Sequence, residues 1–483
     1  MRILVTGASG YVGGRLVPRL LDAGHEVRCL ARNPDKLRDH PWRDRAEVVR
    51  GDVLDGSGLA EASAGMDVAY YLVHAMSGGG GFVSQDARGA RTFARAAEEA
   101  GVGRVVYLGG LAPPGVALSP HMSSRSEVGE ILLASSVPAV VLRAAVIIGS
   151  GSASFEMLRH LTERLPVMTT PRWVRSRVQP IAVRDVLRLL VESAELPEGI
   201  NRTFDIGGPE VLTYARMIQR FAEIAGIRRR WILPVPLLSP GLSSLWVGLV
   251  TPVPPSIARP LVESLRHDAV TREDDLSDLL DDHDRLRFDE AVRLALRRVD
   301  QAHVDTRWSS AAWPTAPSDP LPTDPDWAGG SLYTDERSRV VDASPERLWS
   351  VIEGIGGEQG WYSWPLAWAA RGWIDLAVGG VGPRRGRRDP ARLRTGDSVD
   401  FWRVESVVPG RLLRLRAEMR LPGPAWLDLG VERDGGRTVY RQRALFHPRG
   451  LFGHLYWAAV TPFHGLVFGS MARNIARRAE REA

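Results

Sequence analysis

The first 14 residues constrain the fold more than any other stretch of the chain. An apolar run, Ile3–Val5, is followed by glycines at positions 7, 10 and 13 and then by an amphipathic segment at residues 15–23. This order predicts a buried strand, a tight glycine turn and a helix. The glycines permit the turn, a close approach of the backbone to a ligand, and close packing of helix on strand. Because the N–H groups at the start of such a helix favour phosphate, the stretch predicts a dinucleotide site.

The spacing of Thr6, Gly7, Gly10 and Gly13 resembles the nucleotide-binding turn of the short-chain dehydrogenase/reductase superfamily. More narrowly, it looks like the extended and atypical members that are related to sugar-nucleotide epimerases and NmrA-like proteins. Later stretches fit the same family, and the resemblance covers roughly residues 1–300. They are Gly51-Asp52-Val53, Val105–Leu108, Pro180–Val186 and Phe204–Pro209. The resemblance implies an α/β fold with a doubly wound parallel Rossmann sheet.

Patterns along the chain favour the same fold class. Strands are expected at residues 26–31, 46–53, 67–74, 105–108 and 137–148. A helix is expected at residues 85–100, where apolar residues recur at helical spacing. An amphipathic stretch at residues 279–299 is expected to close this first domain, which would span residues 1–304.

The end of the second strand bears on the choice of cofactor. In this fold an acid near that point binds the ribose of NAD, whereas an arginine accommodates the 2′-phosphate of NADP. No acid lies between Val27 and Pro34, and Arg32 stands at that point. NADP(H) is therefore expected in preference to NAD(H), and the alternative is a solvated arginine at a strand end. The resemblance implies a cofactor site made of Thr6, Gly7, Ser9, Gly10, Tyr11, Val12, Gly13, Arg32, Asp52, Val53, Val73 and His74.

The catalytic pattern of the family is altered in this chain. The family carries a serine after the fifth strand and a Tyr-x-x-x-Lys pair on the next helix, but here His121 and Arg125 stand in place of that pair. Lys36 is the only lysine of the sequence, so the family's lysine is not simply displaced. His121 can act as a general acid or base, and Arg125 can hold a ribose or phosphate oxygen. Alternatively, both residues only bind the cofactor or cap the helix. No metal site is expected.

Composition excludes some classes of protein. The single cysteine, Cys29, cannot form an internal disulfide or a cysteine metal cluster, which favours a reducing compartment and a cytoplasmic location. The chain starts directly with a strand, so no signal peptide is expected. The net charge is +5, yet basic and aromatic residues do not alternate in a known nucleic-acid-binding motif.

A segment without charged residues lies late in the first domain, at residues 231–258. Its length would allow a membrane span, but six prolines argue against a continuous helix. We interpret it as an apolar cap over the substrate pocket, and a patch that touches a membrane surface is the alternative.

A linker and a second domain are expected to follow. Residues 305–330 contain five prolines, which is typical of an extended tether. In residues 331–483, we expect a strand at 338–343, a short helix after Ser344, and strands at 398–404, 411–420, 426–432 and 438–444. A final long helix is expected to end near Ala479, and Thr461-Pro462 either begins or kinks it. This order resembles the START-like helix-grip fold, an α+β domain of unknown function. Its tryptophans, such as Trp361, Trp364, Trp368 and Trp373, would line an apolar cavity or pack in a core, and residues 384–388 form a basic loop.

Three functions are compatible with these features. The first is an atypical NADP(H)-dependent oxidoreductase that acts on a lipophilic small molecule. The second is a non-catalytic NADP(H)-binding sensor or scaffold, and the third is an accessory protein associated with lipid or quinone. The missing tyrosine and lysine favour the second, whereas His121 favours the first. The expected partner is an apolar small molecule in all three.

Overall fold

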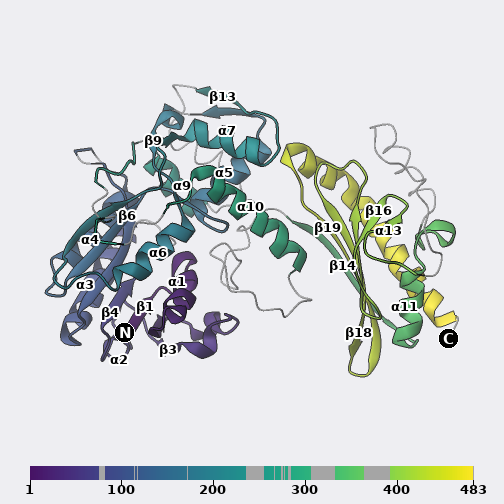
Figure 1. Ribbon diagram of the computed structural model, residues 1–483, viewed down its shortest axis with the longest axis horizontal. Coiled ribbons are helices and arrows are strands. Elements are labelled where there is room, and N and C mark those ends of the chain that lie inside the picture. Colours follow the sequence, from purple (N-terminus) through teal and green to yellow (C-terminus); the bar gives the residue numbers. More distant parts are fainter. Residues whose placement is uncertain are drawn as a thin grey trace. The chain divides into compact units, whose positions relative to one another are not determined.

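The computed structural model describes residues 1–74, 82–113, 115–116, 118–170, 172–234, 255–265, 267–273, 276, 278–280, 284–305, 332–363 and 392–481. The chain divides into two compact units, Met1–Gly330 and Ser331–Ala483 (Figure 1). Each unit has its own hydrophobic core, and each is described by itself. Of the expected linker, residues 305–330, only Asp305 is among the described residues.

A seven-stranded parallel sheet forms the centre of the first unit. Its strands are β1 (Arg2–Thr6), β2 (Glu26–Ala31), β3 (Glu47–Arg50), β4 (Val68–Tyr71), β5 (Arg104–Gly110), β6 (Ala139–Ala144) and β11 (Arg202–Ile206). They lie in the order β11-β6-β5-β4-β1-β2-β3. The predicted Rossmann-like sheet is therefore confirmed. Its strand order reverses between β1 and β4, where sheets of this kind bind ligands at their carboxyl edge.

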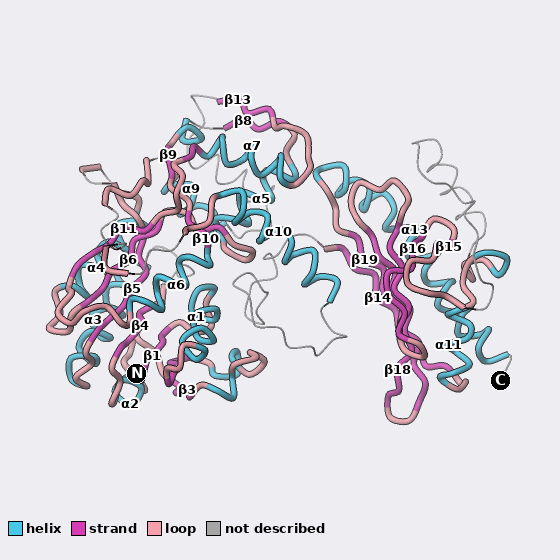
Figure 2. The backbone as a smooth tube through the Cα atoms, in the orientation of Figure 1, coloured by secondary structure: helices cyan, strands magenta, loops and turns pink. Residues whose placement is uncertain are grey.

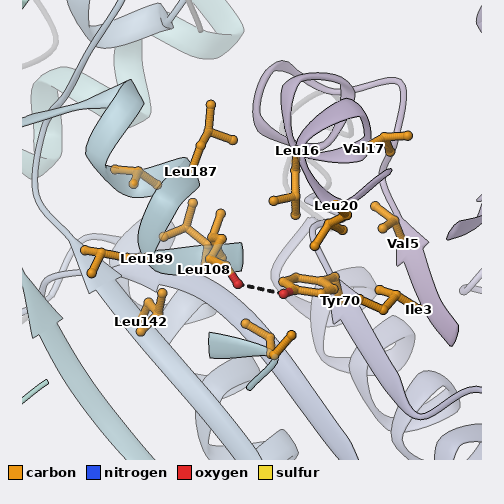
Figure 3. Close-up of a cluster of buried hydrophobic side chains, with 14 of the residues drawn as sticks. Ile3, Val5, Leu16, Val17, Leu20, Tyr70, Leu108, Leu142, Leu187 and Leu189 are labelled. Atoms are coloured by element: carbon orange, nitrogen blue, oxygen red, sulfur yellow. Dashed lines mark hydrogen bonds between the residues drawn. The ribbon is translucent and has the colours of Figure 1, made fainter. Parts of the chain in front are cut away.

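Helices cover both faces of this sheet. They are α1 (Tyr11–Asp22), α2 (Leu59–Ser63), α3 (Phe82–Glu99), α4 (Pro120–Leu133) and α6 (Val183–Ser193). Because side chains alternate along a strand, Ile3 and Val5 pack under α1 and α6, whereas Leu4 packs under α2, α3 and α4. Figure 3 shows the first of these cores, in which the buried Tyr70 hydroxyl donates a 2.6 Å hydrogen bond to the Leu190 carbonyl of α6.

Further elements of the first unit lie outside the main sheet and its five covering helices. Three strand pairs are described: β7 (Ile147–Ile148) with β10 (Ile181–Ala182), β8 (Val167–Thr170) with β13 (Trp231–Pro234), and β9 (Arg177–Val178) with β12 (Leu212–Thr213). The helices are α5 (Ala153–Arg164), α7 (Tyr214–Ile224), α9 (Pro255–Ser264) and α10 (Phe288–Asp305). The 3-10 turns are η1 (Pro34–Leu37), η2 (Arg43–Arg45) and η4 (Arg172–Arg175). The apolar segment at residues 231–258 contributes β13 and the start of α9, and its residues 235–254 lie outside the described residues.

One predicted strand of the first unit differs from the structure by more than three residues. The strand expected at residues 137–148 is two strands, because the chain leaves the main sheet after β6 and pairs with β10 instead. The amphipathic stretch at residues 279–299 is helical only from Phe288 onward. The residues before it are held by side chains, since Asp185 accepts a hydrogen bond from the Leu286 amide and Glu210 accepts one from the Phe288 amide.

The second unit is built on a six-stranded antiparallel sheet, as expected. Its strands are β14 (Tyr333–Val341), β15 (Ser398–Val399), β16 (Trp402–Val408), β17 (Leu412–Ala417), β18 (Ala425–Asp434) and β19 (Arg437–Phe446), and its helical segments are α11 (Pro345–Glu353), η5 (Gly357–Gln359) and α13 (Gly450–Arg481). The order is β14-β19-β18-β17-β16-β15, and Figure 2 shows β14, β18 and β19 side by side. Buried apolar side chains of α11 and of the C-terminal half of α13 pack against this sheet.

Two strand boundaries expected in this unit were wrong. The first strand begins at Tyr333 instead of Ser338. The strand expected at residues 398–404 is broken at Asp400, whose φ of 53° turns the backbone and whose carboxylate accepts a 2.7 Å hydrogen bond from the Trp361 indole. Of the two alternatives for Thr461-Pro462, the helix start is excluded, because the final helix begins at Gly450 and Pro462 lies inside it on an exposed surface. Trp361 packs on Phe401 in the core, whereas the other three tryptophans singled out above and the basic loop at 384–388 lie outside the described residues.

Among the helices that the structure describes, none is both long and apolar enough to cross a membrane.

Candidate active site

The glycine turn between β1 and α1 is closely packed. Gly7 has a φ of 80°, a conformation that favours glycine, and a Cβ atom there would lie 2.5 Å from the Leu72 carbonyl oxygen. A Cβ atom on Gly13 would lie 2.3 Å from the Gly7 carbonyl oxygen. Both glycines are therefore required by the fold, because any side chain would collide with the backbone.

Gly10 differs from these two glycines. It precedes α1 in an extended conformation, with φ −87° and ψ 170°, that any residue can adopt. A Cβ atom on Gly10 would meet only the Gly7 carbonyl oxygen, at 3.2 Å, and Gly10 is exposed. Among the residues that the structure describes, no side chain caps the N-terminus of α1. An uncapped helix start beside a residue that has no side chain is an arrangement that fits a phosphate group.

A cavity of about 490 Å³ opens beside this turn. Its wall combines the start of α1, the residues after β4, the end of β5 and the first turns of α4 with parts of α5, α7 and α9. Eight of the residues expected at a site line it: Gly10, Tyr11, Val12, Gly13, Val73, His74, His121 and Arg125. The rest of the wall is mainly apolar, as with Leu108, Met122 and Leu261. The structure therefore brings the glycine turn and the altered catalytic pair into one cavity.

The other six expected residues do not line this cavity. Thr6 is buried, and its hydroxyl donates a 2.9 Å hydrogen bond to the Tyr70 carbonyl. Val53 is buried in the core under α3, and the Asp52 carboxylate accepts a hydrogen bond from the Leu54 amide. Gly7 and Ser9 lie in the turn, and Arg32 is exposed directly after β2.

His121 belongs to a network of buried polar side chains. Its Nδ1 atom lies 3.2 Å from Nε2 of His74, and Nδ1 of His74 lies 2.9 Å from Oδ2 of Asp86. The Ser124 hydroxyl donates a 2.8 Å hydrogen bond to the same carboxylate oxygen. His121, Ser124 and Asp86 are all less than 9% exposed. The network thus joins the N-terminal parts of α3 and α4 to His74, the third residue after β4.

Burial and charge both act on the two imidazoles. Burial is the largest cause that lowers the pKa of His121, to about 3, and the positive charge of Arg125 lowers it further. Burial also lowers the pKa of His74, and Arg125 adds to that effect while Asp86 opposes it. Both rings are therefore neutral near pH 7. A neutral imidazole can accept a proton at one nitrogen and donate one at the other.

Arg125 lies half-buried in the cavity wall one helical turn after His121. Its Nη1 atom donates a hydrogen bond of 3.2 Å to the Leu108 carbonyl, and its own carbonyl accepts one of 3.3 Å from the Tyr107 hydroxyl. The pKa of Tyr107 is raised, chiefly by burial. Arg125 therefore fixes the end of β5 and places a positive charge beside the two histidines.

Several site residues were not expected from the sequence. Asp86 and Ser124 were missed because an acid and a serine in the first turns of helices are common as surface and capping residues. One signal existed, since His74 follows a parallel strand and His121 begins a helix after the adjacent strand, so both had to meet at the carboxyl edge. The wall contributed by α5, α7 and α9 had no motif to mark it.

In the comparisons with known proteins, two family models match two separate parts of the chain. Residues 7–145 match the family described as NAD(P)H-binding, and residues 327–471 match a family described as a protein of unknown function, DUF2867. The chain is 38% identical over 118 residues to a 3-beta-hydroxysteroid dehydrogenase of Mycolicibacterium neoaurum, which is 22% of this chain and only 31% of that protein. It is 30% identical over 257 residues to a ceramide reductase of Caulobacter vibrioides, which is 51% of this chain and 78% of that protein.

A solved structure shares the fold of the first unit. The crystal structure of Citrobacter sp. triphenylmethane reductase complexed with NADP(H) has a TM-score of 0.50 and 20% identity, and it covers 61% of this chain and 100% of that one. At this level of identity the similarity concerns the fold alone. The match of residues 7–145 and the ceramide reductase identify the family. The chain belongs to the NAD(P)H-binding proteins of the short-chain dehydrogenase/reductase superfamily.

Proposed function

We propose that the first unit is an NAD(P)H-dependent oxidoreductase that interconverts a lipophilic ketone and its alcohol. The observation that carries the proposal is the position of His121, a neutral imidazole in a cavity that also contains the start of α1. A nicotinamide cofactor supplies or accepts the hydride in such a reaction, and the protein supplies orientation and a proton.

The residues present fit the cofactor at the turn. The N–H groups at the start of α1, next to Gly10, would hold the pyrophosphate. The wall at Leu108 and Gly109 would hold the nicotinamide end, close to Arg125 and His121. His121 would hold or receive the proton of the substrate oxygen. The usual tyrosine and lysine would thus be replaced by a histidine that is already neutral.

The chemical class of the substrate follows from the wall and from the relatives. Apolar side chains from α5, from α7 and from the end of α9 and the residue after it line the cavity, among them Met157, Met217 and Leu265. The relatives include a steroid dehydrogenase and a ceramide reductase, both named after substrates with large apolar parts. A large apolar substrate would bury much of its surface in such a pocket.

Turnover tests this proposal directly. We expect the full-length protein to transfer deuterium from C4-deuterated NADPH to the carbonyl carbon of a 3-ketosteroid, of a long-chain ketone or of both, with pyruvate as the polar control. Mass spectrometry of the alcohol product separates enzymatic transfer from background oxidation of NADPH. Binding of NADPH without transfer to either ketone would contradict the proposal and favour a non-catalytic sensor.

Arg32 supports a preference for NADP(H). It is exposed at the carboxyl end of β2, beside the strand that leads into the glycine turn, and it makes no hydrogen bond or ion pair with the described part of the chain. We expect Arg32→Ala to weaken NADPH binding about 10–100-fold, because a charge-assisted hydrogen bond contributes about 1.5–3 kcal/mol, and to leave NADH binding unchanged.

Calorimetric titration of both cofactors measures this effect. Arg91→Ala is the control, since it removes the same charge from the exposed surface of α3. Equal affinity of the wild type for NADPH and NADH would refute the preference.

We also propose that residues 331–483 form a START-like holder for the apolar ligand, tethered by residues 305–330. An antiparallel sheet with a long C-terminal helix packed against it supports the START-like resemblance. A cytoplasmic location, with the protein on a membrane surface at most, fits the lone buried thiol of Cys29.

A further inference from the structure

A buried polar path leads from the cavity into the protein behind His121. It passes from His121 to His74 and from there to Asp86, with separations of 3.2 Å and 2.9 Å. Asp86 is 5% exposed and does not line the cavity. The resemblance to the family assigned no role to Asp86. The inference below rests on the proposed function and adds residues to it.

The hydrogen bonds determine which nitrogen of each ring carries a proton. An ionised carboxylate only accepts hydrogen bonds, and Asp86 already accepts one from Ser124. Nδ1 of His74 must therefore carry the proton in its contact with Asp86, which leaves Nε2 of the neutral ring as an acceptor. That acceptor requires the proton of His121 on Nδ1. Nε2 of His121 is then unprotonated, and among the described residues it has no hydrogen-bond partner.

We propose that Asp86 and His74 are positioning residues that hold His121 with an unprotonated Nε2 toward the cavity, and that they carry away the proton which it receives. When the substrate alcohol is oxidised, its C–H bond breaks and the hydrogen leaves with the electron pair to NAD(P)⁺. The O–H proton passes to Nε2 of His121. The Nδ1 proton of His121 then passes to Nε2 of His74, and the Nδ1 proton of His74 passes to the Asp86 carboxylate. Reduction of the ketone runs the same transfers backward.

The surroundings of the pair explain why a relay is needed. A proton that stayed on His121 would make a buried imidazolium next to Arg125, and burial together with that positive charge disfavours it. Transfer to Asp86 leaves both rings neutral and removes one buried negative charge instead. The polar groups around the two histidines are Asp86 from α3, Ser124 and Arg125 from α4, and Tyr107 from β5, which bonds to Arg125. His267 and Asp268 lie elsewhere on the cavity wall.

Ring-¹⁵N NMR of histidine-labelled, full-length protein without cofactor tests the assignment. We expect protonated Nδ1 and unprotonated Nε2 atoms in both His74 and His121 at pH 7, with resonances assigned by loss in His74→Gln and His121→Phe. In Asp86→Asn, the amide can donate to Nδ1 of His74, so both rings should change to the Nε2-protonated tautomer. Ser124→Ala is the matched control, because it removes a hydrogen bond to Asp86 but leaves the acceptor. It should leave both tautomers unchanged.

A wild-type protein with the proton of His121 on Nε2 would overturn the proposal even if no variant folds. Unchanged tautomers in a folded Asp86→Asn protein would overturn it as well. We also expect Asp86→Asn to slow oxidation of the alcohol formed in the deuterium-transfer test about 100-fold or more at unchanged NADP⁺ affinity. The NMR measurement needs neither cofactor nor substrate. Its failure would therefore remove the relay alone, whereas absent deuterium transfer from NADPH would remove the proposed function.

Discussion

His121→Phe is expected to lower the turnover number about 10²–10⁴-fold, which is the range that a general acid or base contributes. Phenylalanine has a similar shape and keeps the cavity wall filled, but it has no nitrogen that could accept the substrate proton. The affinity for NADPH should stay within about threefold of the wild type, because proton transfer contributes to the transition state and not to ground-state binding.

The turnover number is measured by steady-state kinetics with the apolar substrate identified by deuterium transfer. The affinity for NADPH is measured by titration. Ser123→Ala is the matched control, since Ser123 lies on the same helix with an exposed side chain. Turnover at the wild-type rate in His121→Phe would assign the proton transfer to another group, such as water. Equal losses of turnover and NADPH affinity would assign His121 a binding role.

The central sheet could be predicted from the sequence because its determinants are local. Ile3–Val5 and the glycine turn each require a single arrangement, and the structure shows the resulting strand, turn and helix. The second sheet could be predicted as antiparallel, but Asp400 breaks one strand because its side chain is held by Trp361, which is far away in the sequence. The sequence left open whether Pro462 begins or kinks the final helix, and the structure has it inside the helix on an exposed surface, where a proline can be accommodated.

The candidate site was predictable only in part, because some of its contacts join residues that are far apart in the sequence. Gly10, Gly13 and His121 were marked by a motif or by the replacement of one. Asp86 was not, because its role depends on a contact with His74 that forms only when α3 packs over the end of β4. His74 was expected to bind the cofactor, and the structure adds a contact with His121 that no spacing in the sequence encodes.

Gly10→Val is expected to weaken the binding of NADPH and of NADH by about 100-fold or more while the protein remains folded. The extended backbone of Gly10 accepts a side chain, and its Cβ atom would meet only the Gly7 carbonyl oxygen, at 3.2 Å. The valine would instead occupy the space through which a phosphate reaches the N–H groups of α1. Several charge-assisted hydrogen bonds of about 1.5–3 kcal/mol each would be lost together.

Gly103→Val is the matched control for this substitution. A Cβ atom on Gly103 also lies 3.2 Å from one backbone oxygen, that of Asp67, but Gly103 is exposed just before β5 begins, at the opposite edge of the sheet. Its thermal unfolding temperature should therefore change about as much as that of Gly10→Val, while its cofactor affinity should not change.

The most direct test of a cofactor site at the start of α1 is a calorimetric titration of NADPH into the wild type, Gly10→Val and Gly103→Val. The predicted result is binding by the wild type and by Gly103→Val, and a loss of about 100-fold or more in a folded Gly10→Val. Equal affinity of all three proteins, or no binding of NADPH or NADH by the wild type, would contradict the account.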